Sequence, residues 1–324
     1  MQKFPPTLRR SRNHNWMRSL NKETTLTIDD FILPIFVIEG FNIKEEIPYL
    51  KGNYYYSIDK LLLFIEELVE LSVKAIILFP VVEKEKKDLD GVEAYNSNNL
   101  ICRTIRAIKE TSLYQKIGII TDIALDPYTT HGHDGIIGEN NIVDNHKTVQ
   151  ALCKQSLVIA EAGCHALAPS DMMDGRVEAM RSILNQNNYN DVLIISYSAK
   201  YKSNLYDPFR NTVGSKQNAI DKSTYQLDYH NKNEAEREVE QDIKEGADSI
   251  IIKPGLFYLD IIRNIKVKYN IPLIAYQVSG EYKMLMSQDS YLIMYEALIA
   301  LKRAGADSII SYYTYQFAKN LNDC

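Results

Sequence analysis

Eight short apolar runs recur along the chain and are separated by segments with helical spacing. Most of these runs place branched residues side by side without alternation, which is typical of parallel strands covered on both faces. The runs are FILPIFV, AIILFPV, GIITDIAL, HALAPS, LIISYS, SIIIKPG, LIAYQVS and SIISYY. Helices are predicted between them at residues 59–71, 100–110, 148–161, 177–184, 234–245, 259–268 and 291–302. Eight strand–helix units favour an α/β fold of the TIM (β/α)8 barrel type over a doubly wound sheet.

A weak internal repeat supports this fold. The segments EAGCHALAP, EGADSIIIKP and RAGADSIISY each place a glycine at the end of a helix, directly before a strand. The chain has 324 residues and is 45% hydrophobic, so it can bury one large core. Residues 1–28 fit no unit and are predicted to form an N-terminal arm, either disordered or wrapped around a neighbouring subunit. Residues 29–324 are predicted to form a single barrel domain.

Charge and hydropathy exclude several classes of partner. The net charge is -5 and no basic face is evident, so nucleic acid is not expected. The N-terminus lacks the apolar core of a signal peptide, and no stretch approaches eighteen apolar residues. A soluble cytoplasmic protein without a membrane partner is therefore predicted. Cys102, Cys153, Cys164 and Cys324 are scattered, so neither a disulfide nor a cysteine metal site is expected.

Polar side chains gather where the predicted strands end. In a TIM barrel the chemistry is carried out at the C-terminal ends of the strands. The polar residues at these ends are Asp126, Ser170, Asp171, Lys200, Lys253, Ser279, Tyr312 and Tyr313. The stretch DIALDPYTTHGHDG, residues 122–135, follows the third strand and is expected to cover the mouth of the barrel.

Two lysines, Lys200 and Lys253, follow apolar strands, where a solvated lysine is uncommon. Each of them either reaches the rim, pairs with a carboxylate, or meets the other inside the mouth. In the last case, like charge and desolvation would lower a lysine pKa from about 10.4 toward 7 or 8. A neutral lysine attacks carbonyl carbon to form a Schiff base, as in class I aldolases and certain dehydratases. One lysine suffices for an aldolase, whereas a pair suggests two carbonyl substrates bound side by side.

Six motifs resemble those of one enzyme family, in the same order and over nearly the whole chain. They are TDIALDPYTTHGHDG, APSDMMDGR, SYSAKY, PFRNTVGS, IIKPGLFYLD and AYQVSGEY. The family is porphobilinogen synthase, also called 5-aminolevulinate dehydratase. The resemblance implies a TIM barrel with an N-terminal arm, and a lyase that joins two 5-aminolevulinate molecules into porphobilinogen with loss of two waters, in heme biosynthesis. It also implies a homo-octamer of arm-exchanging dimers.

The resemblance assigns roles to residues at the strand ends. Lys253 and Lys200 match the lysines that form Schiff bases, one with each substrate molecule. Ser279 and Tyr312 match the hydroxyls that hold the carboxylate of the substrate at Lys253. Two other functions stay open: an aldolase-like Schiff-base enzyme, which would need only Lys253, and a non-enzymatic barrel.

A lid over the second substrate is also implied. Arg210, Lys222 and Gln226 match the lid residues that hold the other carboxylate. Lys222 stands where several relatives carry arginine, so a point charge replaces a two-pronged donor and a weaker grip is expected.

The loop at residues 122–135 differs from that of relatives that bind zinc through three cysteines. The corresponding positions here are Ala124, Asp126 and Asp134. Zinc is therefore not expected at this site. Asp122, Asp126 and Asp134 suggest a substrate-covering loop whose aspartates act as acid, base or electrostatic groups, or a site for a hard cation such as magnesium. His131 and His133 are expected to support loop packing rather than to bind zinc.

The resemblance also implies an activating magnesium site. Glu238 stands where some members bind allosteric magnesium at a subunit interface, with Asp171 as a possible neighbour of that site. Alternatively, Glu238 is a solvated helix carboxylate and Asp171 is the N-cap of the following helix.

Overall fold

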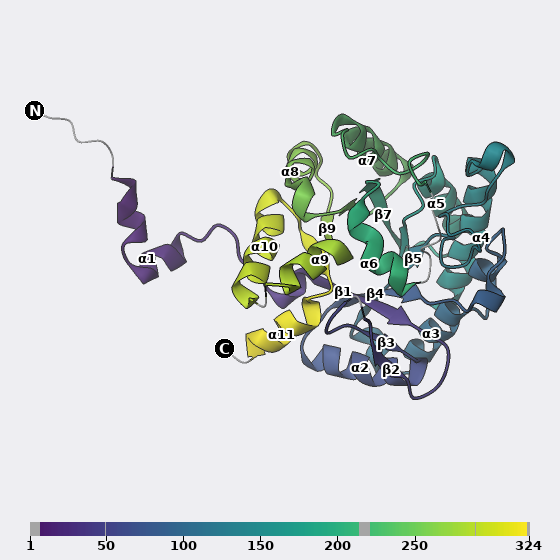
Figure 1. Cartoon of the computed structure of the whole chain (residues 1–324), viewed down its shortest axis with the longest axis horizontal. Helices are drawn as coiled ribbons and strands as arrows, with labels where there is room; N and C mark the ends of the chain where they lie inside the picture. The colour runs from purple at the N-terminus through teal and green to yellow at the C-terminus, as the bar shows by residue number, and fades with distance from the viewer. Residues whose placement is uncertain (1–6, 49, 214–220, 289, 323–324) are drawn as a thin grey trace, which may run out of the picture.

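Eight parallel strands close into a barrel in the computed structural model, which describes residues 7–48, 50–213, 221–288 and 290–322 (Figure 1). The first strand pairs with the last, Phe31 beside Ile309, and with the second, Ile32 beside Ala75. This closure confirms the TIM barrel. The barrel strands are β1 (Phe31–Val37), β4 (Ala75–Pro80), β5 (Gly118–Ile123), β6 (Ala166–Pro169), β7 (Leu193–Lys200), β8 (Ser249–Lys253), β9 (Leu273–Gln277) and β10 (Ser308–Ser311).

Apolar and polar residues do not alternate along the strands, because both faces of each strand are buried. On β4, Ile77 and Phe79 belong to one core cluster, and Phe79 reaches the pocket in the barrel mouth. The neighbouring residues Ile76 and Leu78 belong to a second cluster, with side chains from the helices outside. A polar residue at either kind of position would lose its hydration, so the sequence of each strand is apolar throughout.

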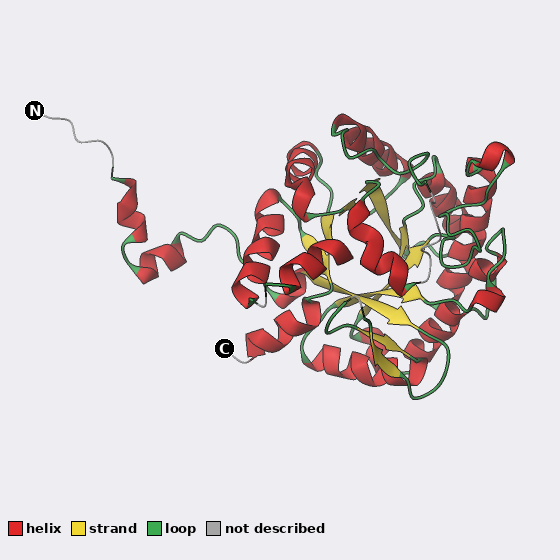
Figure 2. Ribbon diagram, viewed as in Figure 1, coloured by secondary structure: helices red, strands yellow, loops and turns green. Residues whose placement is uncertain are grey.

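Helices surround the barrel (Figure 2). The seven predicted ones are present and shifted by no more than a few residues at either end: α2 (Ile58–Glu70), α3 (Leu100–Lys109), α4 (Asn145–Ala162), α5 (Arg176–Gln186), α7 (Asn233–Glu245), α8 (Leu259–Lys268) and α10 (Tyr291–Ala304). The sequence did not predict α1 (Asn15–Leu20), α6 (Asp207–Thr212), α9 (Ser279–Met286) and α11 (Thr314–Asn322). Of these, α6 and α9 follow β7 and β9, so they help to build the mouth.

A small hairpin adds to the barrel and was also missed. It consists of β2 (Lys44–Glu46) and β3 (Tyr54–Tyr56), which are antiparallel. Strand β3 pairs in parallel with the C-terminal end of β1, where Phe36 lies beside Tyr55. Each strand has only three residues, and those of β2 are charged and exposed, so neither strand is long enough to show a periodic pattern in the sequence.

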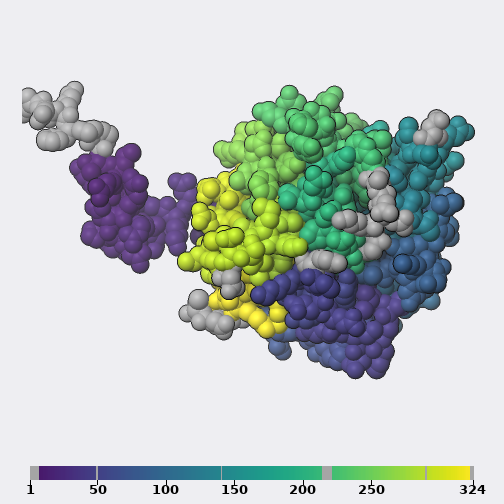
Figure 3. Space-filling model, in the orientation of Figure 1, coloured from purple at the N-terminus to yellow at the C-terminus, as the bar shows by residue number. Residues whose placement is uncertain are grey.

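The N-terminal segment stands away from the barrel (Figure 3). It contains a 3-10 turn at Leu8–Arg12 and α1, and the barrel begins at Phe31, close to the predicted boundary at residue 28. Leu8, Trp16 and Leu20 are 74%, 59% and 76% exposed. Apolar side chains on a projecting arm suit contact with another surface, but the exchange of arms between subunits stays a prediction. Residues 1–6 of the predicted arm lie outside the described residues.

Two further observations concern the cysteines and the length of the helices. Cys102, Cys153 and Cys164 carry free thiols, and Cys324 lies outside the described part of the chain. Within the described ranges, every helix is too short or too polar to cross a lipid bilayer.

Candidate active site

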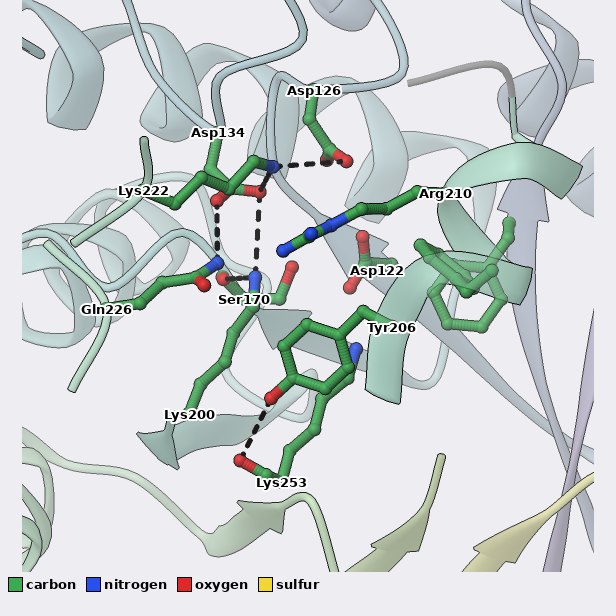
Figure 4. A pocket seen from close by; sticks show the side chains of 12 residues that line it. Asp122, Asp126, Asp134, Ser170, Lys200, Tyr206, Arg210, Lys222, Gln226 and Lys253 are labelled. Carbon is green, nitrogen blue, oxygen red and sulfur yellow. Dashed lines mark hydrogen bonds and ion pairs between the residues drawn. The ribbon is translucent and has the colours of Figure 1, made fainter. Parts of the chain in front are cut away.

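The C-terminal ends of the barrel strands surround one pocket (Figure 4). The strand-end residues Asp122, Ser170, Lys200 and Lys253 come from β5, the loop after β6, β7 and β8, respectively. Because parallel strands end on the same side of a barrel, residues far apart in sequence meet here. The pocket is lined by Phe79, Asp122, Asp126, Asp134, Ser170, Lys200, Tyr206, Phe209, Arg210, Lys222, Gln226 and Lys253.

Lys253 lies in an aromatic box. It is 7% exposed, and its Nζ lies between 4.6 and 5.2 Å from four ring centroids. Burial lowers the pKa of Lys253 to about 7, and the nearby charge of Lys200 acts in the same direction, while three aspartates of the pocket oppose the shift. The amine of Lys253 therefore loses its proton far more readily near neutral pH than a solvated lysine does. The rings are those of Tyr197, Tyr206, Phe209 and Tyr276.

Lys200 has different surroundings, although it is also buried, with 5% exposed. Its Nζ donates a hydrogen bond to the carbonyl oxygen of Ser170 and lies 3.5 Å from Oδ1 of Asp134. Lys200 thus has a carboxylate partner, whereas none of the described carboxylates forms an ion pair with Lys253. The two amines share one pocket, but they are not chemically equivalent.

Asp134 binds the lid residues. Its Oδ1 lies 3.3 Å from Nζ of Lys222, and its Oδ2 accepts a hydrogen bond of 3.2 Å from Nε2 of Gln226. Nζ of Lys222 also lies 3.9 Å from Oδ2 of Asp126. Burial alone would raise the pKa of Asp134, but Lys200 and Lys222 outweigh burial and hold this pKa well below its usual range. An ionised carboxylate of the protein itself therefore occupies donors that the sequence predicts for a substrate carboxylate.

Two further carboxyls, those of Asp122 and Asp126, line the pocket with the amines, and their pKa values are raised where that of Asp134 is lowered. Burial, together with the neighbouring Asp126, raises the pKa of Asp122 to about 7. Burial also raises the pKa of Asp126, against the opposing charge of Lys222. A carboxyl with the pKa of Asp122 can both donate and accept a proton near neutral pH, which is what acid–base catalysis requires.

The two histidines of the loop at residues 122–135 form hydrogen bonds with neighbouring segments. Nε2 of His131 lies 3.0 Å from the carbonyl oxygen of Leu89, and Nδ1 of His133 lies 3.1 Å from the hydroxyl of Tyr225. The histidines thus support packing of the loop, as predicted. Across the described ranges, no three His, Cys, Asp or Glu side chains form a group suited to a metal ion. Ala124 is buried and offers no ligand.

The predicted carboxylate hydroxyls do not line the pocket. Oγ of Ser279 accepts a hydrogen bond of 3.0 Å from the backbone N–H of Phe209, and the hydroxyl of Tyr312 lies 3.2 Å from that of Tyr276. Both hydroxyl side chains are buried beside the aromatic box. Of the three predicted lid residues, Arg210 also reaches the pocket, where its guanidinium lies 5.5 Å from the ring of Tyr206.

Sequence reasoning did not single out the four rings around Lys253. Tyr197 lies on β7 itself, Tyr276 lies on β9, and Tyr206 and Phe209 come from the segment between β7 and β8. The only signal was local, because Phe209 precedes Arg210 in the PFRNTVGS motif. Convergence of rings from three segments follows from barrel closure and not from any short motif.

Asp171 and Glu238 lie away from this pocket. The N-cap alternative for Asp171 was wrong, because α5 begins at Arg176 and its N-cap is Gly175. Asp171 instead accepts a hydrogen bond of 2.8 Å from the N–H of Met173, and its Oδ2 lies 3.7 Å from Nε of Arg176. Glu238 is half-buried on α7 in an open groove lined by Asp174, Gly175, Arg176, Glu178, Arg237, Gln241, Asp242 and Glu245.

The barrel and its pocket define a TIM-barrel enzyme with a lysine amine available as nucleophile and carboxyls available for proton transfer. Comparisons with known proteins identify the family. The model of the family described as "Delta-aminolevulinic acid dehydratase" matches residues 6–320. The chain belongs to this family and is a dehydratase of the hydro-lyase class.

Relatives in distant organisms cover almost the whole chain. The delta-aminolevulinic acid dehydratase of Bradyrhizobium diazoefficiens is 46% identical over 97% of this chain and 90% of its own. That of Methanothermus sociabilis is also 46% identical, over 98% of this chain and 100% of its own. The crystal structure of the Toxoplasma gondii enzyme, in complex with its product porphobilinogen, matches with a TM-score of 0.95 at 39% identity, over 99% of this chain and 93% of that one.

Proposed function

We propose that the protein condenses two 5-aminolevulinate molecules into porphobilinogen, with loss of two waters, as a step of heme biosynthesis. Family membership supports this activity. The observation that carries the mechanism is the Lys253 amine, which is buried among four rings and has a pKa of about 7. An amine that is uncharged near neutral pH can attack a ketone carbon.

Lys253 is proposed to bind one substrate as an imine. The nitrogen lone pair attacks the keto carbon, the ketone oxygen takes up a proton, and the resulting carbinolamine loses water. The iminium that forms makes the neighbouring carbon atoms more acidic than they are in the ketone. Asp122 and Asp126, with raised pKa values, are the proposed partners for these proton transfers. The closed aromatic box excludes water that would hydrolyse the imine.

Lys200 is proposed to bind the second substrate in the same way, with its carboxylate held by the lid. In this structure, Lys222 and Gln226 bind Asp134 instead. A substrate carboxylate offers these donors the same chemistry, so we propose that it takes the place of Asp134 and that Arg210 adds a further charge-assisted contact. At Lys253, Ser279 and Tyr312 would reach the other carboxylate once Phe209 releases the Ser279 hydroxyl.

The direct test is incubation with 5-aminolevulinate, with and without magnesium, and detection of the pyrrole with Ehrlich reagent. Borohydride added with substrate should reduce the imine and leave a mass adduct on the peptide that contains Lys253. A chain that yields no pyrrole between pH 6 and 9 under either condition would refute the proposed reaction. An adduct found only on other peptides would refute the role of Lys253.

The pKa values predict how the rate depends on pH. Below about pH 7 the Lys253 amine is protonated and cannot attack, so kcat/KM should fall by up to about tenfold per pH unit. The imine-forming fraction rises as pH increases through 7. Measuring kcat/KM from pH 5.5 to 9 checks this. A rate that keeps rising to pH 10 would indicate an ordinary solvated lysine and contradict the role of burial.

We also propose that magnesium activates the protein by binding near Glu238. Burial raises the pKa of Glu238, the charge of Arg176 acts against this shift, and the carboxylates of Asp242 and Asp174 add to it, so a cation there would relieve the repulsion that Arg176 leaves. Magnesium prefers carboxylate oxygens and keeps several waters, so one or two carboxylates of the groove, Glu238 among them, would be enough to hold it. No zinc is proposed at the position of the loop aspartates, because Ala124 removes one ligand and no thiolates are present.

Replacing Glu238 with glutamine should abolish this site. Equilibrium dialysis should show one magnesium fewer bound per chain, and stimulation of turnover by magnesium should disappear while activity without magnesium is retained. Glu240→Gln is the matched control, since Glu240 lies on the same helix and pairs with Lys244 at the surface. Equal magnesium binding by Glu238→Gln and Glu240→Gln would place the ion elsewhere.

The assembly and location of the protein are proposals of the same kind. The exposed apolar side chains of the arm support arm-exchanging dimers that assemble into a homo-octamer, and a location in the cytoplasm is proposed with it. Light scattering of the full chain, compared with a chain lacking the arm, tests the assembly.

A further inference from the structure

Glu281 is a buried carboxyl just outside the proposed active site. It lies in the first turn of α9, two residues after Ser279, and is 1% exposed. Burial raises the pKa of Glu281 to about 7, while hydrogen bonds from backbone N–H groups act against this shift. A carboxyl kept in such a place needs donors for its oxygens, because a buried acceptor without a partner destabilises the fold.

The two oxygens of Glu281 bind different segments of the chain. Oε2 accepts a hydrogen bond of 2.9 Å from the N–H of Val278, at the start of its own helix. Oε1 accepts bonds of 2.8 Å from the N–H of Leu256 and 3.4 Å from that of Phe257. The first contact alone would make Glu281 an ordinary helix-capping residue. The second contact reaches the loop that leaves β8, so Glu281 joins two strand-end loops.

These two loops carry residues of the proposed chemistry. Leu256 follows Lys253 by three residues, and Val278 directly precedes Ser279. The two loops that Glu281 links are closely packed. A Cβ on Gly255 would lie 3.0 Å from the carbonyl oxygen of Tyr276, and a Cβ on Gly280 would lie 2.5 Å from that of Leu205. At these glycines the two loops therefore lie directly against β9 and against the segment after β7, so a small shift at the carboxylate bridge would move the backbone next to Lys253 and Ser279.

We infer that Glu281 is a positioning residue, which fixes the backbone of the Lys253 loop against the backbone that carries Ser279. In the proposed reaction, the substrate at Lys253 is held at its keto carbon by the amine and at its carboxylate by Ser279. The separation of these two groups must match the length of the substrate. Glu281 is placed to set that separation without touching the substrate. This inference rests on the proposed function of Lys253.

The test is Glu281→Gln, which keeps the shape of the side chain. An amide has one acceptor oxygen, and its NH2 group would face a backbone N–H, so one of the two contacts must break. We expect kcat/KM to fall by roughly 10- to 100-fold, the scale of a small misplacement of reacting groups. With 5-aminolevulinate and borohydride, the adduct on the Lys253 peptide should form at least tenfold more slowly, while that on the Lys200 peptide keeps its rate.

The control is Asp248→Asn, at the opposite end of β8. Oδ2 of Asp248 also accepts a backbone N–H, that of Ile194, at 2.7 Å. Oδ2 of Asp248 also pairs with the guanidinium of Arg181, and Asp248→Asn removes that charge while its amide oxygen can still accept the N–H of Ile194. Both variants should melt at a lower temperature, but Asp248→Asn should keep both trapping rates. If Glu281→Gln slowed both lysines equally, or neither, Glu281 would be structural only. If Glu281→Gln does not fold, Glu281→Asp replaces it, because the shorter carboxylate cannot reach both loops. The same comparison, trapping at Lys253 relative to trapping at Lys200, is then measured. Wild-type protein without a Lys253 adduct would refute the proposed function and this inference together.

Discussion

Replacing Lys253 with methionine should lower the rate of porphobilinogen formation by more than about 10³-fold, because Lys200, the other amine of the pocket, is needed for the second substrate and cannot hold both. Methionine has a similar length and no charge, and its thioether packs well against rings. The aromatic box should therefore stay filled and the protein should stay folded. Steady-state assays with 5-aminolevulinate, together with circular dichroism and a melting curve, measure the two effects separately. Lys244→Met, at the surface of α7, is the matched control and should keep full activity.

The same substitution at Lys200 separates the proposed reaction from that of a single-lysine enzyme. If two substrates are held by two lysines, Lys200→Met should also lose most of its turnover. Full turnover in Lys200→Met, with loss only in Lys253→Met, would favour aldolase-like chemistry at one amine. Full turnover in both variants would show that neither amine forms an obligatory intermediate.

The barrel could be predicted because its strands are constrained by burial on both faces. Each strand is an apolar run, and each helix between strands keeps one apolar face, so both patterns survive in a single sequence. The elements that were missed lack this constraint. Strand β2 is exposed over all three residues. Helix α6 has only six residues, and α9 has eight and begins with Ser279 and Gly280, which do not favour a helix.

The residues of the site could be named from the sequence, but their partners could not. Lys200 and Lys253 stand at equivalent strand ends, and nothing in the sequence distinguishes their surroundings. The structure gives Lys200 a carboxylate, Asp134, and gives Lys253 four rings. That difference depends on which loop folds over which strand end. It leaves the Lys253 amine buried without an ion pair to any described carboxylate, and burial lowers its pKa, which makes this amine available as a nucleophile.

The function of the loop at residues 122–135 could not be predicted from the sequence alone either. From composition alone, Asp126 and Asp134 fit either a metal site or a metal-free acid–base loop. In the structure, Asp134 lies between Lys200, Lys222 and Gln226, so its negative charge is compensated by the protein itself. Loop and lid are thus joined by contacts that a substrate carboxylate could replace, which favours the substrate-covering function of the loop.

A second large effect is expected on stability, at the buried ion pair of Arg176 and Asp242. Both side chains are 2% exposed, and the guanidinium lies 3.3 Å from Oδ1 and 3.2 Å from Oδ2 of Asp242. The hydroxyl of Ser196 completes the group by donating a hydrogen bond of 2.7 Å to Oδ2. Asp242→Ala leaves the buried guanidinium with only its longer ion pair to Asp171, 3.7 Å from Nε, so the free energy of unfolding should fall by about 3 to 5 kcal/mol.

Urea unfolding of the wild type and of Asp242→Ala measures this loss, and Glu240→Ala on the exposed side of α7 should change the free energy of unfolding by less than about 0.5 kcal/mol. The loss of stability is expected because a buried charge loses its partner, and not because an ion pair is stabilising in itself. Replacing both partners together, Arg176→Met with Asp242→Leu, should therefore recover part of the stability that Asp242→Ala loses, because the buried guanidinium is gone. The recovery is limited by Asp171, whose buried carboxyl loses its ion pair with Arg176 and has to take up a proton. If the double variant were no more stable than Asp242→Ala, packing around α5 and α7 rather than the unpaired guanidinium would account for the loss.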